Sequence, residues 1–121
     1  MTVNSISQRT FNYAFEIIKF CKILKEEKEY ILYKQLLRSG TSIGANVREA
    51  QNAESKPDFI HKMGIAQKET DETIYWLELS KLTLNDESLT DNINSLIKEA
   101  NELLKIIRTI ILNTKQNLKK K

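Results

Sequence analysis

The chain has 121 residues, which is the size of one ordinary domain and leaves no room for a second hydrophobic core. An apolar fraction of 40% supports a packed interior, and 29% charged residues with three glycines and one proline are typical of a helical protein with few turns. The net charge of +3 is too small to indicate a nucleic-acid partner by itself.

Cys21 is the single cysteine, so an internal disulfide and a cysteine-based zinc site are excluded. We expect a buried thiol in a protein of the reducing cytoplasm. No segment approaches the ~20 apolar residues of a membrane span, and the start of the chain lacks the pattern of a signal peptide. The sequence therefore predicts a cytoplasmic protein without membrane contact.

The first half of the chain predicts two helices. The first runs from about Ser7 to Lys28, and its three-and-four spacing assigns to the core Phe11, Phe15, Ile18, Cys21 or Lys22, and Leu24. The second runs from about Tyr30 to Ala53, with one apolar face made of Leu32, Leu36, Gly40, Ile43, Val47 and Ala50. A charged cluster, KEEKE, separates the two helices.

The second half predicts two more helices. Ser55 is a predicted N-cap with Pro57 and Asp58 in the first turn, and the seam that follows contains Phe59, Met63, Ala66, Thr70, Thr73, Leu77, Ser80 and Leu84. After a turn at residues 85–88, the fourth helix runs from about Thr90 to Thr114 through Ile93, Leu96, Ala100, Leu103, Ile107 and Ile110. Residues 115–121 form a basic tail that we expect to be frayed.

Four helices with short connections imply antiparallel neighbours. The predicted fold class is therefore all-α, an antiparallel up-down-up-down four-helix bundle in which residues 1–121 form one domain. The glycines of the segment GTSIG do not contradict a helix, because neither a phosphate-loop lysine nor a preceding strand accompanies them. Gly40 falls on the buried face, so we expect it to allow a close helix contact.

The opposite face of the second helix is basic. Lys34, Arg38 and Arg48 lie within a narrow arc, and neither Lys34 nor Arg38 has an acidic neighbour within one turn of its own helix. These three residues are the candidate nucleic-acid-binding residues, because lysine and arginine neutralise phosphates. Two alternatives are a solvated face and arginines that bind carboxylates of a neighbouring subunit.

Catalytic groups are scarce in this sequence. His61 is the single histidine and is predicted to be solvated, and the acidic cluster of Glu69, Asp71 and Glu72 cannot form a di-metal bundle site without two Glu-x-x-His motifs. We therefore predict no enzyme activity, no catalytic residue, no metal site and no cofactor.

Apolar residues also occur off the predicted core seam of the third helix. Tyr75, Trp76 and Leu79 point away from it, and the apolar stripe of the fourth helix is broadened by Leu104, Ile106, Ile111 and Leu112. Large apolar residues on two faces of a small bundle predict a subunit interface at Tyr75, Trp76 and Leu79.

The run LLRSGTSIGANVREAQNAESKPDFIHKMGIAQKETDETIYWLELS, residues 36–80, resembles the four helix bundle family also known as the 23S ribosomal RNA intervening-sequence proteins. The SIGAN segment, Glu49 and the Ser-x-x-Asp-Phe helix start are its most specific parts. The resemblance implies an antiparallel bundle that assembles as a ring-like homopentamer without established catalytic activity. A related accessory protein of diversity-generating retroelements is a basic pentamer that binds nucleic acid.

Two hypotheses follow from the residues and the resemblance. The first is an oligomer that binds nucleic acid. Its expected target is structured RNA, and RNA or DNA is its expected partner class. The second is a structural adaptor whose ring binds another protein and whose positive charges serve subunit contacts.

Overall fold

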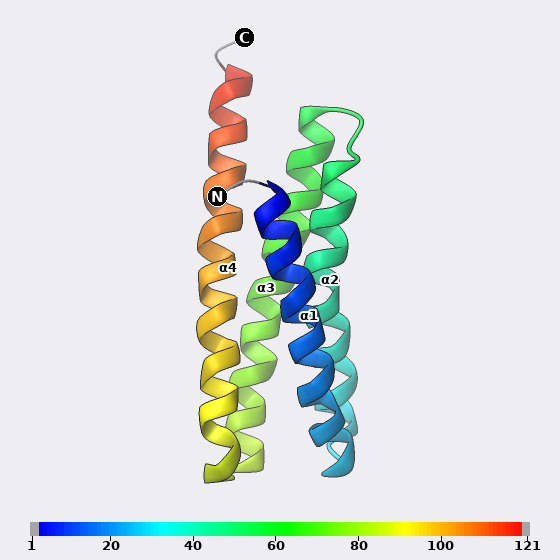
Figure 1. Ribbon diagram of the computed structural model, residues 1–121, viewed down its shortest axis with the longest axis vertical. Coiled ribbons are helices and arrows are strands. Elements are labelled where there is room, and N and C mark those ends of the chain that lie inside the picture. The colour runs from blue at the N-terminus through cyan, green and yellow to red at the C-terminus, as the bar shows by residue number, and fades with distance from the viewer. Residues whose placement is uncertain (1–2, 120–121) are drawn as a thin grey trace.

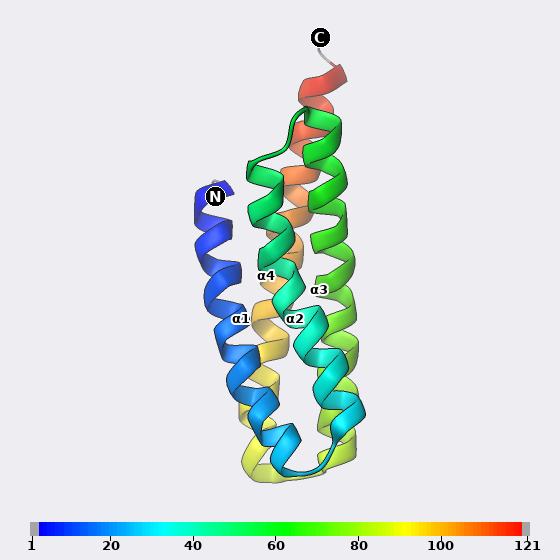
Figure 2. The ribbon, with the colours of Figure 1, turned by 90° about the vertical axis from the view of Figure 1, so that its right-hand side faces the viewer.

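A computed structural model describes residues 3–119, which form four helices: α1 (Val3–Glu26), α2 (Tyr30–Gln51), α3 (Lys56–Leu84) and α4 (Glu87–Lys119). The helices run alternately down and up and are joined by short connections, so the fold is the predicted all-α antiparallel bundle (Figures 1 and 2). Successive helices pack against each other over their length, whereas α1 and α4 share much less contact.

The helix ends follow local capping chemistry. The Ser55 hydroxyl accepts a hydrogen bond of 3.2 Å from the amide of Asp58 and Pro57 lies in the first turn of α3, as predicted. Asn85 ends the same helix in a left-handed conformation with φ 45°. Helix α4 begins before the predicted Thr90 and continues past Thr114 to Lys119, so residues 115–119 of the predicted frayed tail are helical; residues 120–121 lie outside the described part.

Three of the four predicted core faces are confirmed. All six residues assigned to the buried face of α2 are buried, as are most of the seam of α3 and the stripe of α4. On α1 the prediction is wrong for Phe11, Phe15 and Ile18, which are 56%, 59% and 39% exposed. The core side chains of α1 are Ile6, Thr10, Tyr13, Ile17, Phe20, Cys21 and Leu24.

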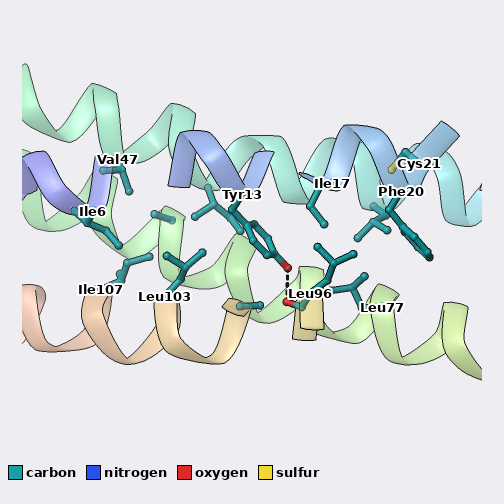
Figure 3. Packing of buried hydrophobic residues seen from close by; sticks show 14 of the residues in the cluster. Ile6, Tyr13, Ile17, Phe20, Cys21, Val47, Leu77, Leu96, Leu103 and Ile107 are labelled. Carbon is teal, nitrogen blue, oxygen red and sulfur yellow. Dashed lines mark hydrogen bonds between the residues drawn. The ribbon is translucent and has the colours of Figure 1, made fainter. Parts of the chain in front are cut away.

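The error on α1 has a simple physical cause. This helix carries two apolar stripes, and both repeat at four-and-three spacing, so periodicity alone cannot tell which stripe faces inward. Figure 3 shows the stripe that does: Ile6, Tyr13, Ile17 and Phe20 point into the bundle. The hydroxyl of Tyr13 donates a hydrogen bond of 2.8 Å to the carbonyl of Leu96, which joins α1 to α4 (Figure 3).

Burial raises the pKa of two titratable groups of α1, Tyr13 and Cys21. Desolvation raises the pKa of the Tyr13 hydroxyl far above its ordinary value, and the charge of Glu99 adds to this effect. Desolvation also raises the pKa of Cys21 to about 12. Cys21 is thus a neutral, buried thiol, as predicted from its isolation in the sequence.

The two glycines of GTSIG let α1 and α2 approach each other. A Cβ atom on buried Gly40 would lie 2.7 Å from Cγ2 and 3.1 Å from Cβ of Ile17. A Cβ atom on Gly44 would lie 3.2 Å from backbone atoms of Thr10. The predicted packing role of Gly40 is therefore confirmed: its missing side chain makes room for Ile17.

Candidate nucleic-acid and assembly surfaces

Arg38 of α2 is bound to two carboxylates of α3. One guanidinium nitrogen donates a 2.8 Å hydrogen bond to Glu69, whose residue is 5% exposed, and the other donates to Glu72. The Glu72 carboxylate also accepts a 3.1 Å bond from the indole of Trp76. Arg38 lacks a counter-ion on its own helix, but the neighbouring helix supplies two, so little of its charge is left for a phosphate.

A neutral pair of hydroxyls continues this network into the core. The Thr73 hydroxyl lies 3.0 Å from that of Ser39 and 2.7 Å from the carbonyl oxygen of Glu69. In the described part of the chain, no buried side-chain nitrogen or oxygen lacks a hydrogen-bond partner. The polar contacts between α2 and α3 are thus saturated, which fixes the lengthwise register of the two helices.

Replacing Arg38 tests this network. We expect Arg38→Ala to lower the free energy of unfolding by ~1–3 kcal/mol, because the buried Glu69 carboxylate loses its charged donor. The double variant Arg38→Ala/Glu69→Gln should recover part of the loss, since an amide costs less than a carboxylate to bury. Urea denaturation at fixed protein concentration measures both; equal stability of Arg38→Ala and the parent chain would contradict the prediction.

The other two residues of the predicted ridge differ from Arg38. Lys34 is exposed, and no ion pair of its side chain occurs in the described residues. The guanidinium carbon of Arg48 lies 5.7 Å from the ring centre of Phe11, a cation–π distance that leaves the charge partly open to solvent. The structure thus places Lys34, Arg38 and Arg48 on one helix but gives them three different environments.

An apolar groove runs between α1 and α2 on the outside of the bundle. It has a volume of about 450 Å³ and is lined by Ser7, Phe11, Ala14, Ile18, Thr41, Gly44, Ala45, Arg48 and Glu49. Phe15 lies one turn from Phe11 and Ile18 on the same helix and is also exposed. This surface was not predicted from the sequence, because Phe11 and Phe15 were assigned to the core.

The predicted interface residues of α3 are exposed to different degrees. Tyr75 is 58% exposed, whereas Trp76 and Leu79 are partly buried against the core. The rings of Tyr75 and Trp76 meet edge to face at 4.9 Å between centroids. On the same face Leu82 is 78% exposed and Asp71 and Glu78 are exposed, so this stripe of α3 combines apolar and acidic side chains.

Beside this stripe lies a second groove of about 590 Å³ between α3 and α4. Its lining includes Glu78, Leu82, Asp86 and Glu87. Lys81 also lines this groove, so its lining has three carboxylates and one lysine. The groove between α1 and α2 is lined by Arg48 and Glu49, and exposed Lys22 continues the stripe of Phe11, Phe15 and Ile18. The two surfaces lie on opposite sides of the bundle, since α1 and α3 are not adjacent around it (Figures 1 and 2).

Within residues 3–119, no group of three or more His, Cys, Asp or Glu residues could hold a metal ion. His61 is exposed, as predicted. The carboxylates of Glu69 and Glu72 bind Arg38 and are not directed at an open cavity. No helix in this part of the chain is long and apolar enough to cross a membrane.

These features define a four-helix bundle protein with an exposed apolar groove between α1 and α2 and an exposed stripe of apolar and acidic residues on α3. The model of the 23S rRNA-intervening sequence protein family matches residues 3–109, and the chain belongs to that family. The predicted resemblance is therefore confirmed.

A solved structure agrees with this assignment. It is the crystal structure of a protein of unknown function from the S23 ribosomal protein family of Bacteroides thetaiotaomicron. The two chains are 42% identical, with a TM-score of 0.85, and the match covers 92% of this chain and 98% of the other. No functionally curated protein matches the chain.

Proposed function

We propose that this protein is a non-catalytic homo-oligomer that binds structured RNA, and the family resemblance favours a ring of five subunits. The observation that carries the assembly is the presence of two different exposed surfaces with large apolar side chains on one small domain, the apolar groove between α1 and α2 and the mixed stripe of α3. A symmetric dimer needs one self-complementary patch, whereas a ring needs two patches that complement each other.

The two surfaces have exposed residues at the same spacing, and their charges are partly complementary. On α1 the exposed residues Phe11, Phe15, Ile18 and Lys22 repeat at four-three-four spacing. On α3 the exposed residues Asp71, Tyr75, Glu78 and Leu82 repeat at the same spacing. We infer that the stripe of α3 in one subunit packs along the groove between α1 and α2 of the next, with Lys22 and Arg48 facing the carboxylates.

RNA as the partner is suggested by the family's name, which refers to an intervening sequence of 23S rRNA. Assembly supports it further, because weak phosphate contacts repeated on a rigid ring act together and raise avidity by roughly 10²–10⁴. Among the ridge residues, exposed Lys34 is the best placed to take part, because Arg38 is bound to Glu69 and Glu72 and Arg48 lines the groove proposed as the interface.

Fluorescence anisotropy with a labelled RNA hairpin tests the proposal. We expect salt-sensitive binding by the oligomer, with affinity falling steeply between about 50 and 200 mM salt and little dependence on sequence. A variant that is monomeric by light scattering should bind far more weakly. Failure of the intact oligomer to bind the hairpin or duplex DNA at about 50 mM salt would refute RNA binding and favour an adaptor ring that binds another protein.

A further inference from the structure

Charge is distributed very unevenly along this chain. Residues 103–121 contain six of the 19 basic residues and no acidic residue, which leaves 13 basic and 16 acidic residues in the first 102. The end of the chain therefore has a formal charge of +6 and the remainder −3. The small net charge of +3 conceals a strongly basic segment, and such asymmetry is typical of polyanion-binding proteins.

The four of these basic residues that the structure describes lie on α4, and Lys98 precedes them on the same helix. Lys98, Lys105, Arg108, Lys115 and Lys119 are all exposed. At 100° per residue, Lys98, Lys105, Arg108 and Lys115 fall within an arc of about 100°, and a rise of 1.5 Å per residue spreads them over about 25 Å. They form one continuous basic face, which we call the α4 basic face.

Two acidic residues, Glu99 and Glu102, lie on α4 between Lys98 and Lys105. Glu99 accepts two hydrogen bonds of 2.7 Å from Arg9 of α1, and these bonds raise the pKa of Arg9. Glu102 is half-buried, and its charge also acts on Arg9. Glu99 is thus paired with α1, whereas Glu102 lies one turn from Lys98 and Lys105 but forms no ion pair with either within residues 3–119.

The cations of this face are free of ion pairs within residues 3–119, unlike Arg38. Exposed Asn101, Thr109, Asn113 and Gln116 lie among them. Such neutral groups donate hydrogen bonds to phosphate and sugar oxygens. The last turns of α4 also extend beyond the other three helices, so a ligand reaches them without obstruction (Figures 1 and 2).

We propose that the α4 basic face is the principal phosphate-binding surface of the protein and contacts the backbone of RNA. This inference rests on the proposed RNA-binding function and assigns it to residues outside the ridge of α2. A length of about 25 Å equals about seven successive phosphates of one strand of duplex DNA at 3.4 Å each, and it spans at least as many in the more closely spaced A-form RNA duplex. The spacing of the charges therefore suits a backbone that lies along the helix.

An anionic membrane is a poorer fit for this face. A helix that lies in a membrane interface needs a broad apolar face turned to the lipid. The apolar face of α4 is used by the bundle core, and among its described residues Leu112 is the exposed large apolar side chain. The face offers phosphate contacts with almost no apolar surface to bury, which favours a nucleic-acid backbone.

Two variants with the same loss of charge test the assignment. The first is Lys105→Gln/Arg108→Gln/Lys115→Gln on α4. The matched control is Lys25→Gln/Lys28→Gln/Lys68→Gln, which removes three exposed lysines that are not among the residues proposed for RNA binding or for the subunit interface. Circular dichroism and light scattering establish that both retain the fold and mass of the parent. Fluorescence anisotropy with a labelled RNA hairpin then gives affinity and its salt dependence.

We expect the α4 variant to bind the hairpin at least about tenfold more weakly at physiological salt, with a shallower salt dependence by about 0.7–0.9 per lost contact. The control should lose less than about threefold. Equal losses in both variants, or full affinity of the α4 variant, would overturn the assignment while leaving RNA binding intact. An intact protein that binds phosphatidylserine vesicles but no RNA would overturn both proposals.

Discussion

Gly40→Ala is expected to lower the free energy of unfolding by ~1–3 kcal/mol, although alanine ordinarily favours a helix. The added Cβ would lie 2.7 Å from Cγ2 of Ile17 and 3.1 Å from its Cβ. The Ile17 Cβ is anchored to the backbone of α1, so a change of rotamer cannot relieve the clash, and α1 must move away from α2. Gly40→Leu should lose more. Urea denaturation at fixed protein concentration measures the change.

The matched control is Gly64→Ala, because a Cβ at Gly64 would meet no atom within 4 Å. There we expect unchanged stability or a gain of about 0.5–1 kcal/mol from helix propensity. Combining Gly40→Ala with Ile17→Ala should cost less than the sum of the two single losses, since the smaller side chain makes room for the new methyl group. Similar behaviour of Gly40→Ala and Gly64→Ala would contradict the packing role of Gly40.

The second large effect concerns assembly. We expect Phe15→Lys to convert the oligomer into a folded monomer of 14.1 kDa, because the change places a charge in an apolar interface yet touches no core contact of its own subunit. Tyr75→Lys should do the same from the opposite face. Light scattering gives the masses, and circular dichroism verifies that the helices remain.

Mixing the two variants distinguishes a ring from a symmetric dimer. Each variant keeps one intact face, so one good interface can form between them, and the mixture should contain heterodimers of about twice 14.1 kDa. Neither variant alone should dimerise. A parent protein that is monomeric at micromolar concentration, or a Phe15→Lys variant with the parent's mass, would contradict the proposed interface.

Local sequence patterns were enough to predict the four helices and the all-α fold class of this chain. The three-and-four spacing from Leu32 to Ala50 and from Ile93 to Ile107 predicts the buried faces of α2 and α4, because one apolar stripe on each helix dominates. Ser55, Pro57 and Asp58 predict the start of α3 because capping depends on neighbouring residues alone. The burial of Gly40 followed from its position on the same stripe as Leu36 and Ile43.

Which side chains lie at the surface depended on contacts between helices. The sequence of a single helix does not encode such contacts. The fit of Ile17 against Gly40 decided which apolar stripe of α1 is buried. Phe11 and Phe15, on the other stripe, therefore became surface residues. The charge left on Arg38 was decided by Glu69 and Glu72, which lie more than 30 positions away in sequence but beside it in space. The composition of this chain, its helical periodicity and its short connections determine four helices in antiparallel order. Their packing alone determines which side chains remain exposed for a partner, because burial and ion pairing are properties of neighbours in space.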